Sequence, residues 1–137
     1  MIKLFISYLF VFLYIGCHDS IISNNQNFPN TNFTKVIAYQ VNNNNVPKKD
    51  HKGKILSTEQ INTFLNTLND PTSFDDRLGL RCFKPDLKVV FYNQNNHPIS
   101  NIEISFECNQ ISSFPELDYQ SFTVEGYHRI KDGLLLE

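Results

Sequence analysis

The sequence is poor in the features that most often reveal an activity. Its 137 residues include only five glycines and three cysteines, and they form no glycine-rich loop for a phosphate and no dinucleotide fingerprint. The C-x-x-C spacing that marks zinc sites is absent as well. With 12 basic and 14 acidic residues, the formal net charge is −2, so the composition shows no bias toward nucleic acid. We therefore expect no cofactor and no catalytic constellation.

The first sixteen residues have the pattern of an export signal. Lys3 gives a short positive start, and the stretch from Leu4 to Ile15 is apolar except for Ser7. This apolar run is shorter than an ordinary membrane span, which needs about 20 residues. We predict that residues 1–16 are a signal peptide, and the alternative is a retained anchor helix.

The end of this segment resembles the lipobox of bacterial lipoproteins. Gly16 and Cys17 match the cleavage site, whose cysteine carries diacylglycerol, whereas Tyr14 stands where leucine is usual. The resemblance implies lipidation of Cys17, with ordinary signal cleavage as the alternative. Each buried methylene contributes roughly 0.8 kcal/mol, so several acyl chains anchor a protein firmly. Residues 17–31 are polar and asparagine-rich, which predicts a flexible tether before a single domain at 32–137.

Two cysteines remain once Cys17 is lipidated. Cys82 and Cys108 would then lie in a chain that is exported to an oxidising compartment, where a disulfide is the default. Closing a loop of this length contributes roughly 3 to 4 kcal/mol on the chain-entropy account. A reactive thiol pair and half of a metal site are the alternatives.

The stretch between these cysteines predicts a β-hairpin in the middle of a sheet. Apolar and polar residues alternate over 101–108, as in a strand with one buried and one solvated face. Residues 87–92 are apolar on both faces except for Lys88, which suits a central strand. The asparagine-rich segment 93–98 predicts the turn. The numbers of residues that face each other across the hairpin should then sum to about 189 to 191. Cys82 and Cys108 sum to 190, so the hairpin should bring them together, although Pro85 interrupts the hydrogen-bond ladder between them and the turn.

A capped amphipathic helix is predicted over residues 57–69. Ser57 is an N-cap, Gln60 completes a capping box, and Leu56 can staple onto Ile61. Apolar residues then recur at i, i+3, i+4 and i+7, which places them on one stripe that faces the core. The stripe consists of Ile61, Phe64, Leu65 and Leu68.

The other segments complete the prediction of an α+β fold. Residues 32–41 predict a first strand, and residues 109–119 are predicted to be irregular. Apolar residues recur about every third position over 120–137, which favours a helix, with a strand at 120–124 as the alternative. The order strand, helix, hairpin, helix predicts a small antiparallel sheet with helices on one face. In the first strand, one face is expected to hold Phe33, Ile37, Tyr39 and Val41.

Several polar groups are candidates for chemistry. Residues 46–54 form a basic cluster that either contacts anionic headgroups or an acidic partner, or is a solvated loop. Asp75 and Asp76 offer too few oxygen ligands for a hard metal ion, so a capped turn is expected. A cysteine nucleophile beside His128, or zinc held by the two hairpin cysteines and histidines such as His51, lacks the spacing typical of such sites. His97 lies at the tip of the predicted hairpin, roughly 30 Å from the sulfurs.

One known group shares the pattern of the hairpin. The pattern consists of Cys82-Phe83-Lys84-Pro85, Val89 to Tyr92, an asparagine-rich turn, Ile102-Glu103-Ile104 and Cys108. It resembles a group of small uncharacterised bacterial lipoproteins, in which Arg-His follows the first motif and C-x-x-C ends the second strand. Here Asp86 and Leu87 replace Arg-His, and Ser105 replaces the first cysteine of C-x-x-C. The resemblance implies an envelope location and this fold. If relatives use that cysteine pair for redox or metal chemistry, this chain lacks one of its two cysteines.

Two functions follow from these expectations. The first is a non-catalytic binding or structural module, such as an inhibitor or immunity protein, in a lipoprotein of the bacterial cell envelope. It would be held to the membrane by its lipid anchor, with another envelope protein as its partner and no role for nucleic acid. The alternative is a thiol-redox or metal-binding protein that uses Cys82 and Cys108. The expected partner surface is the solvated face of the second hairpin arm, at Asn101, Glu103, Ser105 and Glu107.

Overall fold

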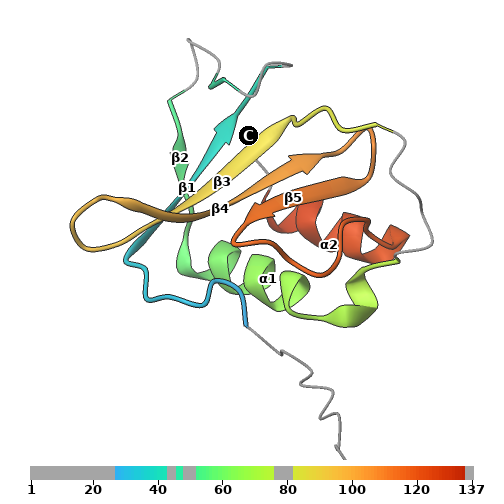
Figure 1. Cartoon of the computed structure of the whole chain (residues 1–137), viewed down its shortest axis with the longest axis horizontal. Coiled ribbons are helices and arrows are strands. Elements are labelled where there is room, and N and C mark those ends of the chain that lie inside the picture. The colour runs from blue at the N-terminus through green and yellow to red at the C-terminus, as the bar shows by residue number, and fades with distance from the viewer. Residues whose placement is uncertain (1–26, 43–45, 48–51, 76–81, 135–137) are drawn as a thin grey trace, which may run out of the picture.

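Five antiparallel strands form one sheet, and two helices cover one of its faces (Figure 1). The computed structural model describes residues 27–42, 46–47, 52–75 and 82–134. The α+β prediction is confirmed, including the C-terminal helix. In sheet order the strands are β2 (Lys54–Ile55), β1 (Lys35–Gln40), β3 (Leu87–Tyr92), β4 (Pro98–Ser105) and β5 (Gln110–Phe114). The helices are α1 (Thr58–Leu68), the short 3-10 helix η1 (Pro71–Ser73) and α2 (Val124–Gly133).

The central hairpin forms in the predicted register. β3 and β4 are antiparallel, and their residue numbers sum to 191 from Leu87↔Ile104 to Phe91↔Ser100. A register shift at Phe91/Tyr92 then brings Tyr92 opposite Pro98. β3 is the third of the five strands in the sheet. This position explains why its apolar residues occupy both faces.

Helix α1 begins where its sequence signals predict. The Ser57 hydroxyl accepts a hydrogen bond from the Gln60 backbone N–H at 3.2 Å, and the Gln60 side chain accepts one from the Ser57 N–H at 3.1 Å. Phe64 and Leu68 are buried in the core, and Ile61 and Leu65 pack against its edge. The capping box and the apolar stripe are therefore both confirmed.

The predicted C-terminal helix is confirmed from Val124 onward, as α2, and it lies unusually close to η1. Before it, Ser121 and Phe122 form β-bridges to Gln110 and Phe74, so residues 120–122 are extended and not helical. The Thr123 hydroxyl caps it by accepting from the Gly126 N–H at 3.1 Å. A Cβ at Gly126 would lie 2.1 Å from the Ser73 carbonyl oxygen, so only glycine fits this approach. The Ser73 carbonyl in turn accepts from the Thr123 N–H at 2.9 Å. Ile130 and Leu134 anchor the other end of the helix in the core.

The first strand buries a different set of residues from the predicted one. Val36 and Ala38 lie in the core, so Ile37 and Tyr39 point to the opposite face of the sheet. Phe33 instead packs on the core side, with its ring centroid 5.2 Å from that of Phe91. The predicted grouping was wrong because both faces of this strand carry apolar residues. The sequence therefore gives no polar face that would show which side of the strand is buried.

Two edge strands were not predicted. Residues 109–119 are not wholly irregular, because Gln110–Phe114 forms β5 beside β4, with Ile111 opposite Ile104. Asn109 adopts a left-handed backbone conformation, with φ 55°, in the turn that connects these strands. At the other edge, β2 pairs through Ile55 with Ile37 of β1.

The packed domain begins earlier than residue 32. Phe28 is only 4% exposed, and its ring lies 5.5 Å from that of Phe91. The Asn69 side chain accepts from the Phe28 N–H at 2.6 Å and donates to the Phe28 carbonyl at 3.0 Å. Phe28, which the prediction assigned to a flexible tether, therefore packs in the domain. The signal peptide, Cys17 and residues up to 26 lie outside the described residues.

Candidate functional site at the disulfide and the β5 edge

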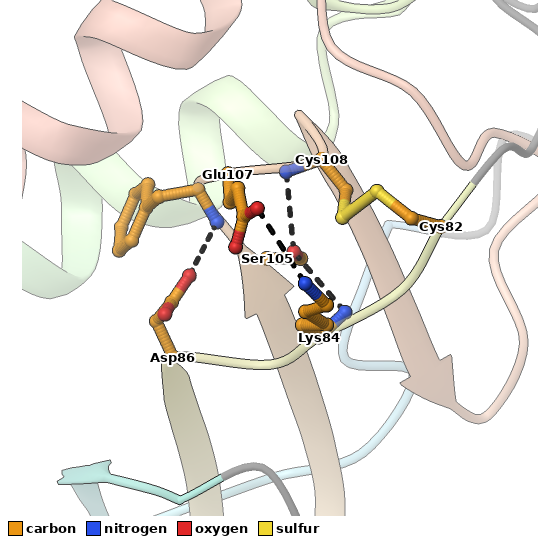
Figure 2. The surroundings of a disulfide bond; sticks show 7 residues. Cys82, Lys84, Asp86, Ser105, Glu107 and Cys108 are labelled. Carbon is orange, nitrogen blue, oxygen red and sulfur yellow. Dashed lines mark hydrogen bonds and ion pairs between the residues drawn. A yellow bond between two sulfur atoms is a disulfide. The ribbon is translucent and has the colours of Figure 1, made fainter.

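A disulfide joins Cys82 to Cys108, as predicted, with their Cα atoms 5.8 Å apart. It lies at the end of the β3–β4 hairpin that is opposite the turn (Figure 2). Cys82 is exposed, and Cys108 is partly buried. Because such bonds persist in oxidising compartments, the disulfide indicates a location outside the cytoplasm.

Ser105 supports this closure from inside. Its side chain is fully buried, and its hydroxyl accepts hydrogen bonds from the backbone N–H groups of Lys84 and Cys108, each at 3.3 Å. Figure 2 shows the hydroxyl between the two chain segments that the disulfide joins. Ser105 is therefore a hydrogen-bond acceptor for two backbone groups beside the disulfide.

Asp86 performs a similar task on the other side of the closure. Its carboxylate accepts from the Phe106 N–H at 2.8 Å (Figure 2). The Asp86 N–H donates to the Ile104 carbonyl at 2.8 Å. The hydrogen bonds between the two arms of the hairpin therefore begin directly after Pro85. The ion pair between Lys84 and Glu107 is longer, at 3.6 Å, and exposed, so it contributes little. Asp86 and Ser105 both therefore stabilise the fold at this end of the hairpin.

The expected partner surface is only partly accessible. Ser105 is buried, and Asn101 and Glu103 are half-buried. Glu103 pairs with Lys88 at 2.9 Å. Glu107 alone among the four residues is exposed. The alternation correctly predicted the burial of Ile102 and Ile104. It was wrong for Ser105, which it placed on the solvated face, because the segment at 82–85 lies against this residue and Lys84 donates to its hydroxyl.

A tyrosine pair lies on the sheet face away from the core. The hydroxyl oxygens of Tyr39 and Tyr92 are 2.9 Å apart, and the Lys35 ammonium lies 5.0 Å from the centre of the Tyr92 ring. Burial, followed by the hydrogen bond to Tyr92, raises the pKa of Tyr39 to about 12. Tyr39 therefore remains a neutral phenol near pH 7, which suits a structural hydrogen bond and not a general base.

A groove of about 840 Å³ runs along the outer side of β5. Its walls come from β5, from the loop that follows β5, and from Cys82 and Phe83. Phe83 and Phe114 are 39% and 67% exposed. Gln110 also lines the groove, and its buried Oε1 atom has no hydrogen-bond partner. Sequence reasoning missed this groove because it missed β5.

The other candidates do not converge on a site. Among the described residues, no group of three or more histidine, cysteine or acidic side chains could hold a metal ion. His97 and His128 are both exposed. His51, Lys48, Lys49, Asp76 and Arg77 lie outside the described residues, whereas Lys52 and Lys54 are exposed.

Comparisons with known proteins add no family to these observations. Neither the protein-family models, nor the curated proteins, nor the solved structures include a match to this chain. Within the ranges that the structure describes, no helix is both long and apolar enough to cross a membrane. The disulfide end of the hairpin and the β5 groove are therefore the two features that bear on function.

Proposed function

We propose that this chain is an exported lipoprotein of the bacterial cell envelope whose domain binds another envelope protein and catalyses no reaction. One observation carries the proposal: Cys82 and Cys108 are bonded to each other inside a closure that Ser105 and Asp86 complete. Sulfurs held in this way stabilise the fold of an exported domain. The lipobox-like sequence around Cys17 supports the anchor.

A thiol-redox or metal-binding protein is the second candidate. Its supporting observation is the exposure of Cys82, which leaves one sulfur-bearing residue within reach of a reductant or a partner thiol. Against it, the cysteines are separated by 26 positions and lack the short C-x-x-C spacing that tunes a reactive thiol.

The intact mass of the protein extracted from membranes of its host tests the first proposal. We expect the mass of residues 17–137 with a diacylglycerol and further acyl chains, reduced by two hydrogens for the disulfide. Treatment with a reductant should restore those hydrogens and change nothing else. Full-length, unmodified polypeptide in the cytosol would contradict the proposal.

Thiol titration separates the first candidate from a metal-binding protein, and an activity screen with and without reductant separates it from a thiol-redox protein. The mature protein, denatured without reductant, should show no free thiol. Two free thiols together with a stoichiometric bound metal would establish the second candidate instead. The Cys82→Ser variant is the matched control, because it must release one titratable thiol from Cys108.

A further inference from the structure

The outer edge of β5 has backbone groups that are open to pairing. The Ile111 N–H donates to the Gln120 carbonyl at 2.8 Å, and the Phe122 N–H donates to the Asn109 carbonyl at 3.1 Å. These bonds lie on the side of β5 away from β4, so alternation places the N–H and C=O of Ser113 on the same outer edge. No backbone group in the described ranges pairs with either of them.

Residues 120–122 cover this edge at Gln110 and Ile111, but the edge at Ser113 lacks the usual protection against another strand. Edge strands are commonly guarded by charged side chains, proline or bulges. The sequence of β5 is QISSF, without charge or proline, and its pairing with β4 is regular. Phe114 and Phe83 instead present exposed rings beside the groove. An open edge beside apolar walls is the arrangement that binds an extended peptide.

A buried acceptor in the groove lacks a donor. Gln110 is 3% exposed, it lines the groove, and its Oε1 atom has no partner. Buried polar groups in folded proteins are nearly always paired. A ligand that brings an N–H or O–H group into the groove would satisfy this oxygen.

The charge of the groove indicates the complementary charge of the ligand. Of the described residues that line it, Glu116 is the charged one and none is basic. Asp118 lines the hollow that adjoins it, together with Glu116 and Leu117. A segment with basic side chains therefore matches the groove better than an acidic one.

We propose that the β5 groove binds an extended, basic segment of another envelope protein, which pairs with the outward N–H and C=O of Ser113, at the end of β5 that residues 120–122 leave open. Apolar side chains of the segment would pack beside Phe83 and Phe114, and a donor would reach Gln110. This inference rests on the proposed function, because it names the surface and the chemistry of the partner.

The test is selection from a library of random displayed peptides that are long enough to pair with Ser113 and to span the groove. The target is the mature protein as purified from its host, in detergent where it is anchored. We expect the selected peptides to alternate apolar with lysine or arginine residues. Acidic peptides, or no selection at all, would overturn the proposal.

Variants then locate the binding. Ser113→Pro removes the outward N–H and should weaken a selected peptide at least about tenfold, because one backbone bond is lost and the approach is blocked. Ser113→Ala is its control: it removes the hydroxyl that accepts from the Leu117 N–H but keeps the backbone donor. Equal affinities for the two variants would contradict strand pairing.

A second variant pair tests the charge. Glu116→Lys should weaken the same peptide about tenfold. Asp132→Lys reverses an exposed acidic residue of α2 that does not line the groove, and should leave the affinity unchanged. Comparable losses for both variants would show that net charge, not the groove, attracts the peptide.

The outcomes also separate this inference from the proposed function. Self-association that Ser113→Pro abolishes would mean that a second copy occupies β5, which overturns a basic partner segment. A lipidated, disulfide-bonded protein that selects no peptide would overturn the groove alone. Basic peptides selected by a protein without lipid would support the groove and overturn the anchor.

Discussion

The two ends of the β3–β4 hairpin are closed by different kinds of chemistry. At the turn, Asn93 accepts hydrogen bonds from the N–H groups of Asn95 and His97 at 2.9 and 3.0 Å, so neighbours in sequence do the work. At the other end, a disulfide joins residues 26 positions apart. The difference teaches that a hairpin can be specified locally at its turn while its open end needs long-range contacts.

The disulfide end of the hairpin should contribute more to the free energy of unfolding than the turn does. Replacing both cysteines with serine is expected to lower the free energy of unfolding by about 3 to 4 kcal/mol, because the unfolded chain is no longer cross-linked. Urea unfolding measures this change. Wild type in a reductant should match the double variant. If the oxidised wild type unfolds at the same urea concentration, the comparison between the two ends fails.

Ser105→Ala should produce the next largest effect. It leaves the N–H groups of Lys84 and Cys108 without their acceptor, which costs about 1 to 3 kcal/mol for buried groups. Denaturant midpoints with the disulfide intact measure this loss. Ser112→Ala, at an exposed position of the neighbouring strand, is the matched control and should change the midpoint little. A loss no greater than that of the control would place Ser105 outside the closure.

At the turn, Asn96 tests the role of backbone conformation. Its φ is 59°, a left-handed conformation that costs a typical L-residue roughly 1 to 2 kcal/mol. Asn96→Ala should therefore destabilise by about 1 kcal/mol, since asparagine tolerates this conformation better. Asn96→Gly should stay within about 0.5 kcal/mol of wild type. Both variants lose the bond from Lys35 to the Asn96 side chain, so their difference isolates the backbone.

Asn93→Ala should give the smallest change. It removes the acceptor for Asn95 and His97 at an exposed turn, where water replaces it, so a loss of about 0.5 kcal/mol is expected. Thermal and urea midpoints measure it. A loss as large as that of Ser105→Ala would erase the distinction between the two ends.

The sequence predicted those elements whose signals are local. Ser57 and Gln60 lie three residues apart, and the register of the hairpin followed from its turn and its alternation. β5 was missed because only Ile111 of its five residues lies in the core, so its pairing with β4 determines it. The same dependence on distant partners hid the packing of Phe28 and the burial of Ser105.

The groove could not be predicted for a related reason. It forms where Cys82 and Phe83 meet β5 and the loop after it, and the disulfide brings these segments together. The pairing of the cysteines was predictable from their number and compartment. The open edge beside them was not, because Gln110 and Ser113 have no sequence signal of their own.

The docking of Phe28 limits how far the domain can stand from a bilayer. If Cys17 carries the lipid, the chain between Cys17 and Phe28 reaches at most roughly 40 Å when fully extended. A flexible tether that ended at residue 31 instead would reach roughly 10 Å further. The domain would then stay within a thin layer next to its own membrane, and a soluble partner would have to enter that layer in order to bind.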